Sequence, residues 1–91
     1  MDAVAMELSV SRIVKLEREG SVKAYCDLAI GGAFLVKGVR VVHGKNGLFV
    51  SMPRQQRKDG VWIDSVEALT PEAKQDVTRV VLEAYQQQVA A

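Results

Sequence analysis

Cysteine and histidine each occur only once in this 91-residue sequence, and each scarcity excludes a kind of structure. The single cysteine, Cys26, cannot close a disulfide within the chain, which excludes a fold held together by internal disulfides. With the single histidine, His43, it supplies too few ligands for a zinc site within one chain. We expect Cys26 to be a buried structural thiol, because it falls in an apolar strand pattern. We expect His43 to be a solvated residue at a strand end.

Long apolar runs are also missing. The longest apolar stretches are far shorter than the about 20 residues of a transmembrane helix. The N-terminal segment MDAVAMELSV carries Asp2 and no early cation, unlike a secretory signal. We therefore expect a cytoplasmic protein without a membrane partner. Its length fits one domain over residues 1–91, with residues 1–5 and 89–91 flexible.

No arrangement of residues in the sequence points to catalysis. Nucleophilic catalysis needs a serine or cysteine beside a base, and His43 is the only histidine. No glycine-rich phosphate loop precedes a helix. The carboxylates are scattered, although the sequence leaves open a pair contributed by separate strands. We expect no enzymatic activity, no metal, no cofactor and no small-molecule substrate.

Alternation of apolar and polar residues predicts two half-buried strands over residues 8–16 and 22–30. Gly31-Gly32 predicts a two-residue hairpin turn after the second, because such turns require positive φ angles. In the first strand, the predicted buried face carries Leu8, Val10, Val14 and Leu16, with Ile13 on the opposite face.

Further strands are predicted over residues 33–43, 48–52 and 61–64. Gly44-Lys45-Asn46-Gly47 is a strong hairpin signal. Gly38 indicates a bulge, because glycine inside a strand often marks one. A bulge reverses the faces of later residues, so the side to which Arg40 points stays open. Trp62 and Phe49 could offer stacking surfaces, but as large aromatic residues in short strands they are better explained as core.

One amphipathic helix is predicted at the end of the chain. Thr70-Pro71-Glu72 is a favourable start, because Thr70 can cap the first amides and Pro71 suits the first helical position. Apolar residues then recur at helical spacing to about Gln87. The fold class is therefore α+β: an antiparallel sheet of four to five strands followed by one C-terminal amphipathic helix that covers one sheet face.

Charge is segregated along the chain although the net charge is only +1. Residues 37–58 contain six cations and no acid, whereas residues 59–91 contain six acids and two cations. Such a basic segment could contact several phosphates, or it could be ordinary solvated surface. Its cations are Lys37, Arg40, Lys45, Arg54, Arg57 and Lys58. Gln55 and Gln56 could read base edges, but glutamines in a loop are more often simply solvated.

The sequence resembles the stage V sporulation protein G family, also called septation protein G. Three segments carry the resemblance: MELSVSRIVKLEREGSVKAYCDLAI, FLVKGVRVVHGKNGLFVSMPRQQRKDG and VLEAYQQ. The similarity is densest at GLFVSMP and at the following aspartate–glycine pair. It extends from about Met6 to Gln87.

The resemblance implies a bacterial, cytoplasmic homodimer whose sheet edges pair across the dimer. It implies a site-preferring regulator that binds DNA, and in some members RNA, and affects septation, sporulation and gene expression. The implied contacts lie in the loop Arg54–Lys58 and around the final helix, which here carries Lys74 and Arg79. The chain departs from the family pattern in that loop, in residues 64–69 and in its less basic helix. We expect these departures to alter the target rather than the fold.

A protein-interaction adaptor is the alternative function. An exposed strand edge could pair with another chain, and the acidic C-terminal segment could dock a basic partner. The basic segment would then be ordinary solvated surface.

Overall fold

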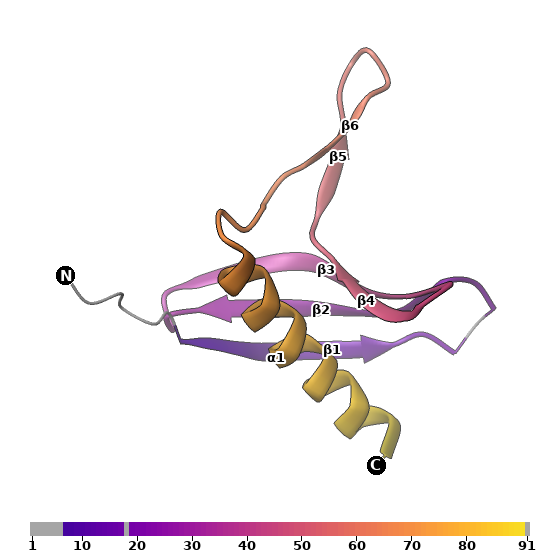
Figure 1. The fold of residues 1–91 in the computed structure, drawn as a ribbon, viewed down its shortest axis with the longest axis vertical. Helices are drawn as coiled ribbons and strands as arrows, with labels where there is room; N and C mark the ends of the chain where they lie inside the picture. The colour runs from indigo at the N-terminus through magenta and orange to yellow at the C-terminus, as the bar shows by residue number, and fades with distance from the viewer. Residues whose placement is uncertain (1–6, 18, 91) are drawn as a thin grey trace.

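A four-stranded antiparallel sheet, one helix and a separate two-stranded hairpin make up the protein in a computed structural model (Figure 1). The structure describes residues 7–17 and 19–90. The predicted flexibility of residues 1–5 and of Ala91 lies outside the described residues. The α+β class predicted from the sequence is confirmed.

The main sheet follows chain order, β1-β2-β3-β4, and every neighbouring pair is antiparallel. Gly31 and Gly32 have φ angles of 60° and 65°, as the predicted turn requires. Pairing resumes only at Ile30 and Phe34, so the turn is one residue longer than predicted. The strand bounds are Leu8–Lys15 for β1, Val22–Ile30 for β2, Phe34–Gly44 for β3 and Gly47–Ser51 for β4.

A bulge in β1 reverses part of the predicted burial pattern. Val10 pairs with Leu28 and Arg12 with Asp27, so Ser11 is an extra residue in the ladder. The bulge turns Ile13 toward the core and leaves Val14 42% exposed. The prediction that Val14 lies on the buried face and Ile13 on the opposite face was therefore wrong.

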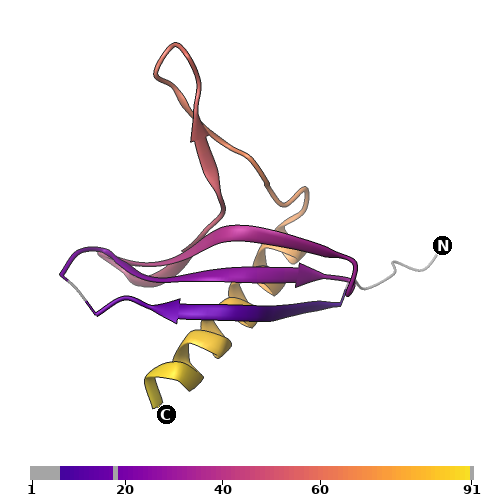
Figure 2. The same ribbon diagram turned by 180° about the vertical axis from the view of Figure 1, so that it is seen from behind.

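Helix α1 (Pro71–Ala90) crosses one face of the sheet, where it lies against all four strands (Figure 1). Its predicted cap is present, since the Thr70 Oγ1 accepts a hydrogen bond from the Ala73 amide at 3.1 Å. The helix continues three residues beyond the predicted end at Gln87. The opposite sheet face, turned toward the viewer in Figure 2, carries no helix within the described residues; we call it the helix-free face.

The core lies between the two central strands and the helix. Its fully or nearly fully buried members are Ala24, Cys26 and Leu28 from β2, Val39 and Val41 from β3, and Val81 from α1. His43 is exposed near the end of β3, as predicted. No helix within the described residues has both the length and the apolar composition needed to cross a lipid bilayer.

Cys26 is buried as predicted, with only 3% of its surface exposed. Burial, and secondarily the neighbouring Asp27 carboxylate, raise the pKa of its thiol from 9.0 to about 11. Because the thiolate is the reactive form, the fraction available near neutral pH falls about a hundredfold. We expect 5,5′-dithiobis(2-nitrobenzoic acid) at pH 8 to label the native protein at least that much more slowly than the guanidinium-unfolded chain. Equal rates would contradict the burial of Cys26.

The predicted cation-rich loop is instead one side of a projecting hairpin, which we call the arm (residues 54–64; Figure 1). Its strands β5 (Arg54–Gln56) and β6 (Trp62–Asp64) pair with each other, and the Ser65 amide donates to the Pro53 carbonyl at 2.8 Å across the base. Of the described helices and strands, β5 and β6 lie close only to each other. The predicted strand over residues 61–64 exists but does not join the main sheet.

Candidate nucleic-acid interface

The cations predicted to bind nucleic acid fall into four groups in the structure. Lys37, Arg40 and Arg54 border a concavity where the arm leaves the sheet. Arg57 and Lys58 lie at the tip of the arm, Lys45 lies in the β3–β4 turn, and Lys74 and Arg79 lie on α1.

The bulge predicted at Gly38 is present and determines where Arg40 points. Cys26 pairs with Val39 and Asp27 with Lys37, so Gly38 is the extra residue, with a φ of 87°. Because of this extra residue, Val36 and Val39 both face the core. Lys37 and Arg40 therefore both lie on the helix-free face, and the side that the sequence left open is settled.

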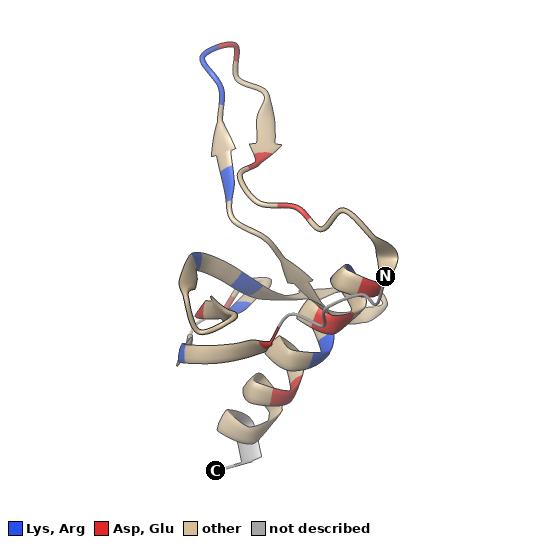
Figure 3. Cartoon of the chain, turned by 90° about the vertical axis from the view of Figure 1, so that its left-hand side faces the viewer, with Lys and Arg blue, Asp and Glu red and all other residues tan. Residues whose placement is uncertain are grey.

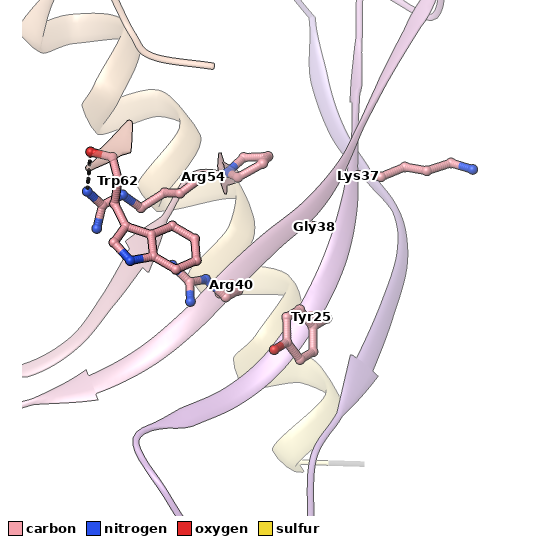
Figure 4. Close-up of a pocket in the computed structure, with 7 residues that line it drawn as sticks. Tyr25, Lys37, Gly38, Arg40, Arg54 and Trp62 are labelled. Atoms are coloured by element: carbon pink, nitrogen blue, oxygen red, sulfur yellow. Dashed lines mark hydrogen bonds between the residues drawn. The ribbon is translucent and has the colours of Figure 1, made fainter. Parts of the chain in front are cut away.

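The concavity between the arm and the sheet has a volume of about 540 Å³; we call it the arm–sheet concavity. Figure 4 shows the Trp62 indole beside the Arg40 and Arg54 side chains at one end, with Lys37 extending to the other side. The Trp62 ring and the two arginine side chains thus lie together, whereas the Lys37 side chain extends away from them (Figure 4). Its lining residues are Tyr25, Lys37, Gly38, Arg40, Pro53, Arg54 and Trp62.

Neighbouring polar groups hold both arginines of the concavity in place. The Arg40 Nη2 donates to the Ser51 Oγ at 2.9 Å. The Arg54 Nε lies 3.0 Å from the Asp64 Oδ1, and its Nη2 donates to the Trp62 carbonyl at 3.4 Å. A guanidinium has five N–H donors, so these contacts orient each arginine and leave donors for a phosphate.

The tip of the arm carries exposed charges of both signs (Figure 3). The Arg57 Nη2 lies 3.2 Å from the Asp59 Oδ2, and both side chains are about half exposed. Such an exposed pair contributes at most about 1 kcal/mol, so a phosphate can displace the carboxylate at small cost. Lys58 follows Arg57 in the turn and is also exposed.

The two glutamines of the arm differ in their contacts. The Gln56 Nε2 donates to the Gly60 carbonyl at 3.1 Å, which braces the turn at the tip. Gln55 is exposed and pairs through its backbone with Ile63. Gln56 therefore has a structural contact, and Gln55 has no side-chain hydrogen bond among the described residues.

The remaining predicted cations lie apart from the concavity. The β3–β4 turn with Lys45 lies at one end of the sheet, away from the tip of the arm (Figure 1). α1 lies against the opposite sheet face, and Arg79 is flanked there by Asp76 at 3.8 Å and Glu83 at 4.0 Å. The structure does not bring Lys45, Lys74 or Arg79 into the arm–sheet concavity.

Aromatic side chains are the part of this surface that the sequence prediction missed. Trp62 is 54% exposed and Phe49 is 49% exposed, so the prediction that both belong to the core was wrong. Tyr25, on the helix-free face of β2, is 38% exposed and lines the arm–sheet concavity with Trp62. The signal for Phe49 was its position between Leu48 and Val50, because alternate residues of a strand face opposite sides.

Comparison with known proteins gives one consistent family. A family model described as SpoVG matches residues 6–87. The chain is 43% identical over 82 residues to a protein of Archaeoglobus fulgidus, covering 90% of this chain and 96% of that protein. It is 34% identical over 86 residues to one of Heliobacterium modesticaldum, covering 94% and 97%. Both proteins carry the name SpoVG, and that name describes each provisionally as a septation protein.

Proposed function

The chain belongs to the SpoVG family, and from that premise we propose that it is a homodimeric regulator that binds nucleic acid and acts in septation. The names of its relatives support the septation role and describe no reaction. The regulated process is gene expression linked to septation and sporulation, and the bound polymer is DNA or RNA. We propose that the protein acts in the cytoplasm and without catalysis.

One observation carries the proposal of nucleic-acid binding. The acid-free segment of residues 37–58 folds so that Lys37, Arg40 and Arg54 border a single concavity while Arg57 and Lys58 project on the arm. A polyanion lying along the arm and into the concavity can contact all five cations. Each phosphate neutralised in this way releases counterions, which supplies most of the affinity of such complexes.

Two features support dimerisation. The arm is a two-stranded hairpin, and such a hairpin alone is at best marginally stable in water. The outer edges of β1 and β4 have no strand partner among the described residues, and open edges are sites where another chain pairs. We expect light scattering at micromolar concentration to give about twice the chain mass of 10.0 kDa. A monomer mass would overturn the dimer.

Salt dependence of binding tests the proposed function. About four or five phosphate contacts predict that affinity falls roughly 150- to 500-fold for a labelled duplex, and roughly 50- to 130-fold for a labelled single strand, between 50 and 200 mM salt. Fluorescence anisotropy of the labelled oligonucleotide measures this affinity. Absence of binding to DNA or RNA of either form at 50 mM salt would overturn the proposal.

Alanine substitutions in two regions assign the binding surface. The variant Arg54→Ala/Arg57→Ala/Lys58→Ala removes three cations of the arm and should abolish most binding at moderate salt while retaining the circular dichroism spectrum. The control Lys74→Ala/Arg79→Ala removes the two cations of α1, which lies on the other side of the sheet. Equal affinity of the arm variant and the wild type would assign binding elsewhere.

A protein-interaction adaptor is the second candidate function. Two large apolar side chains outside the arm–sheet concavity are exposed to solvent: Phe34 with 75% and Leu69 with 93% of its surface. Together with the open strand edges, they favour contact with another protein. A chain that forms the dimer but binds no nucleic acid at 50 mM salt would favour the adaptor.

A further inference from the structure

We propose that the arm–sheet concavity binds single-stranded nucleic acid, with a base stacked on the Trp62 indole and phosphates held by Lys37, Arg40 and Arg54. This site deepens the proposed function and rests on it, because it specifies the form of nucleic acid and the surface that binds it.

The exposure of Trp62 is the first argument. Tryptophan is usually well buried in folded proteins, yet here 54% of its surface faces solvent on a hairpin that has no core of its own. Its backbone position is fixed, since it pairs with Gln56 and its carbonyl accepts from Arg54. The indole ring lies beside the Arg40 and Arg54 side chains at the edge of the concavity (Figure 4).

The combination of chemical groups is the second argument. The lining contains two aromatic residues and three cations but no carboxylate. Aromatic rings accept any base by stacking, and cations nearby follow the phosphates of the same strand. A neutral peptide would gain nothing from three cations, and an acidic peptide would gain nothing from an exposed aromatic ring that stacks on bases. The bases of an intact duplex are stacked on each other, so a ring can reach them only in a single strand.

Nearby carboxylates do not neutralise the positive charge of the arm–sheet concavity. Asp64 lies outside the concavity and engages the Arg54 Nε at 3.0 Å, and the Trp62 carbonyl accepts from Nη2, so Nη1 and the second N–H of Nη2 stay available. Asp27 lies in register with Lys37 on β3 and with Arg12 on β1. The helix-free face around Asp27 therefore carries more cations than acids.

The shape of the concavity is determined by the backbone. Gly38 and Pro53 both line it, and a Cβ added at Gly38 would lie 3.9 Å from the Pro53 Cβ. Its volume of about 540 Å³ falls within the about 300–1,000 Å³ of pockets that enclose small ligands. A nucleotide, with its base, sugar and phosphate, is a small ligand of this class. The Arg40 contact to Ser51 keeps one phosphate ligand in position before binding.

Intrinsic fluorescence gives a direct test, because Trp62 is the only tryptophan of the chain. Titration of the wild-type protein with unlabelled dT8 and U8 at 50 mM salt should quench the tryptophan emission to a plateau. A GC-rich duplex of about twelve base pairs, which stays paired at this salt, should quench it far less. Raising the salt to 200 mM should reverse the quenching, since the phosphates contribute most of the affinity.

Substitution of Trp62 provides the second test. Trp62→Ala should weaken binding of labelled dT8 and U8 by about 5- to 150-fold, which corresponds to the loss of one stacked base. Trp62→Phe should restore part of that loss, because phenylalanine keeps an aromatic face. The matched control is Phe49→Ala, which removes a similarly exposed aromatic residue of the helix-free face that does not line the concavity. Anisotropy of the labelled oligonucleotide measures the affinity of the wild type and of these three variants.

The outcomes separate this inference from the proposed function. Binding of nucleic acid with unchanged tryptophan emission, or with equal affinity in Trp62→Ala, overturns the site and leaves the function standing. Equal quenching by the duplex overturns the preference for single strands. A shift of the emission on dilution without nucleic acid would show that a second copy covers Trp62, and would also overturn the site. If Trp62→Ala does not fold, the wild-type quenching decides.

Discussion

Replacing Leu28 by alanine is expected to lower the free energy of unfolding by about 2–5 kcal/mol. Leu28 is completely buried in β2, where it pairs with Val10 on one side and Val36 on the other. The substitution removes buried methyl groups and leaves a cavity that the rigid ladder cannot fill. A domain of this size has a total stability of roughly 5–15 kcal/mol, so a large share would be lost.

Urea unfolding followed by far-ultraviolet circular dichroism at fixed protein concentration measures this effect. Tryptophan emission is unsuitable as the probe, because Trp62 is already half exposed in the native state. The control is Leu69→Ala, the same substitution at a side chain that is 93% exposed, and we expect a change within about 0.5 kcal/mol. Similar losses in both variants would contradict the position of the core.

Replacing Gly38 by valine is expected to lower the free energy of unfolding by about 1–3 kcal/mol. Space is not the obstacle, because the nearest atom to an added Cβ would be 3.9 Å away. The obstacle is the φ of 87°, which a β-branched residue rarely adopts. Urea unfolding measures the loss, and a change below about 0.5 kcal/mol would contradict the bulge.

Gly38→Val should also weaken nucleic-acid binding. If the strand relieves the strain by expelling the bulge, Arg40 turns from the helix-free face to the core side and leaves the arm–sheet concavity. The control is Gly38→Asn, because asparagine accepts positive φ more readily than valine. We expect it to retain more stability and more affinity than Gly38→Val, and the reverse order would contradict this explanation.

Most elements of the fold follow from local signals in the sequence. Paired glycines, the Gly44–Gly47 turn and the Thr70 cap each constrain a few neighbouring residues, and all three appear in the structure. The bulge at Gly38 was also predictable, because a glycine inside a strand often indicates a bulge. The bulge at Ser11 was not, since serine is compatible with a regular ladder, and one unseen extra residue reversed the faces of Ile13 and Val14.

The candidate site was predictable in charge but not in shape. The segment RQQRKDG has no alternation of apolar residues, so sequence reasoning treated it as a loop. Its strand character depends on pairing with Trp62–Asp64 across the turn, which no local pattern reports. The same pairing brings Asp64 to Arg54 and displays the Trp62 ring. The sequence therefore identifies the cations directly, but the concavity that they border depends on strand pairing between residues far apart in the chain.

The closure at the base of the arm makes residues 54–64 an interchangeable unit. The hydrogen bond from Ser65 to Pro53 fixes the entry and exit of the hairpin at one distance, whatever lies between them. Because β5 and β6 lie close to no other described helix or strand, we expect changes of sequence beyond that point to leave the pairing of the main sheet and the packing of α1 intact. Substitutions in the arm should therefore change its surface with little effect on the stability of the sheet.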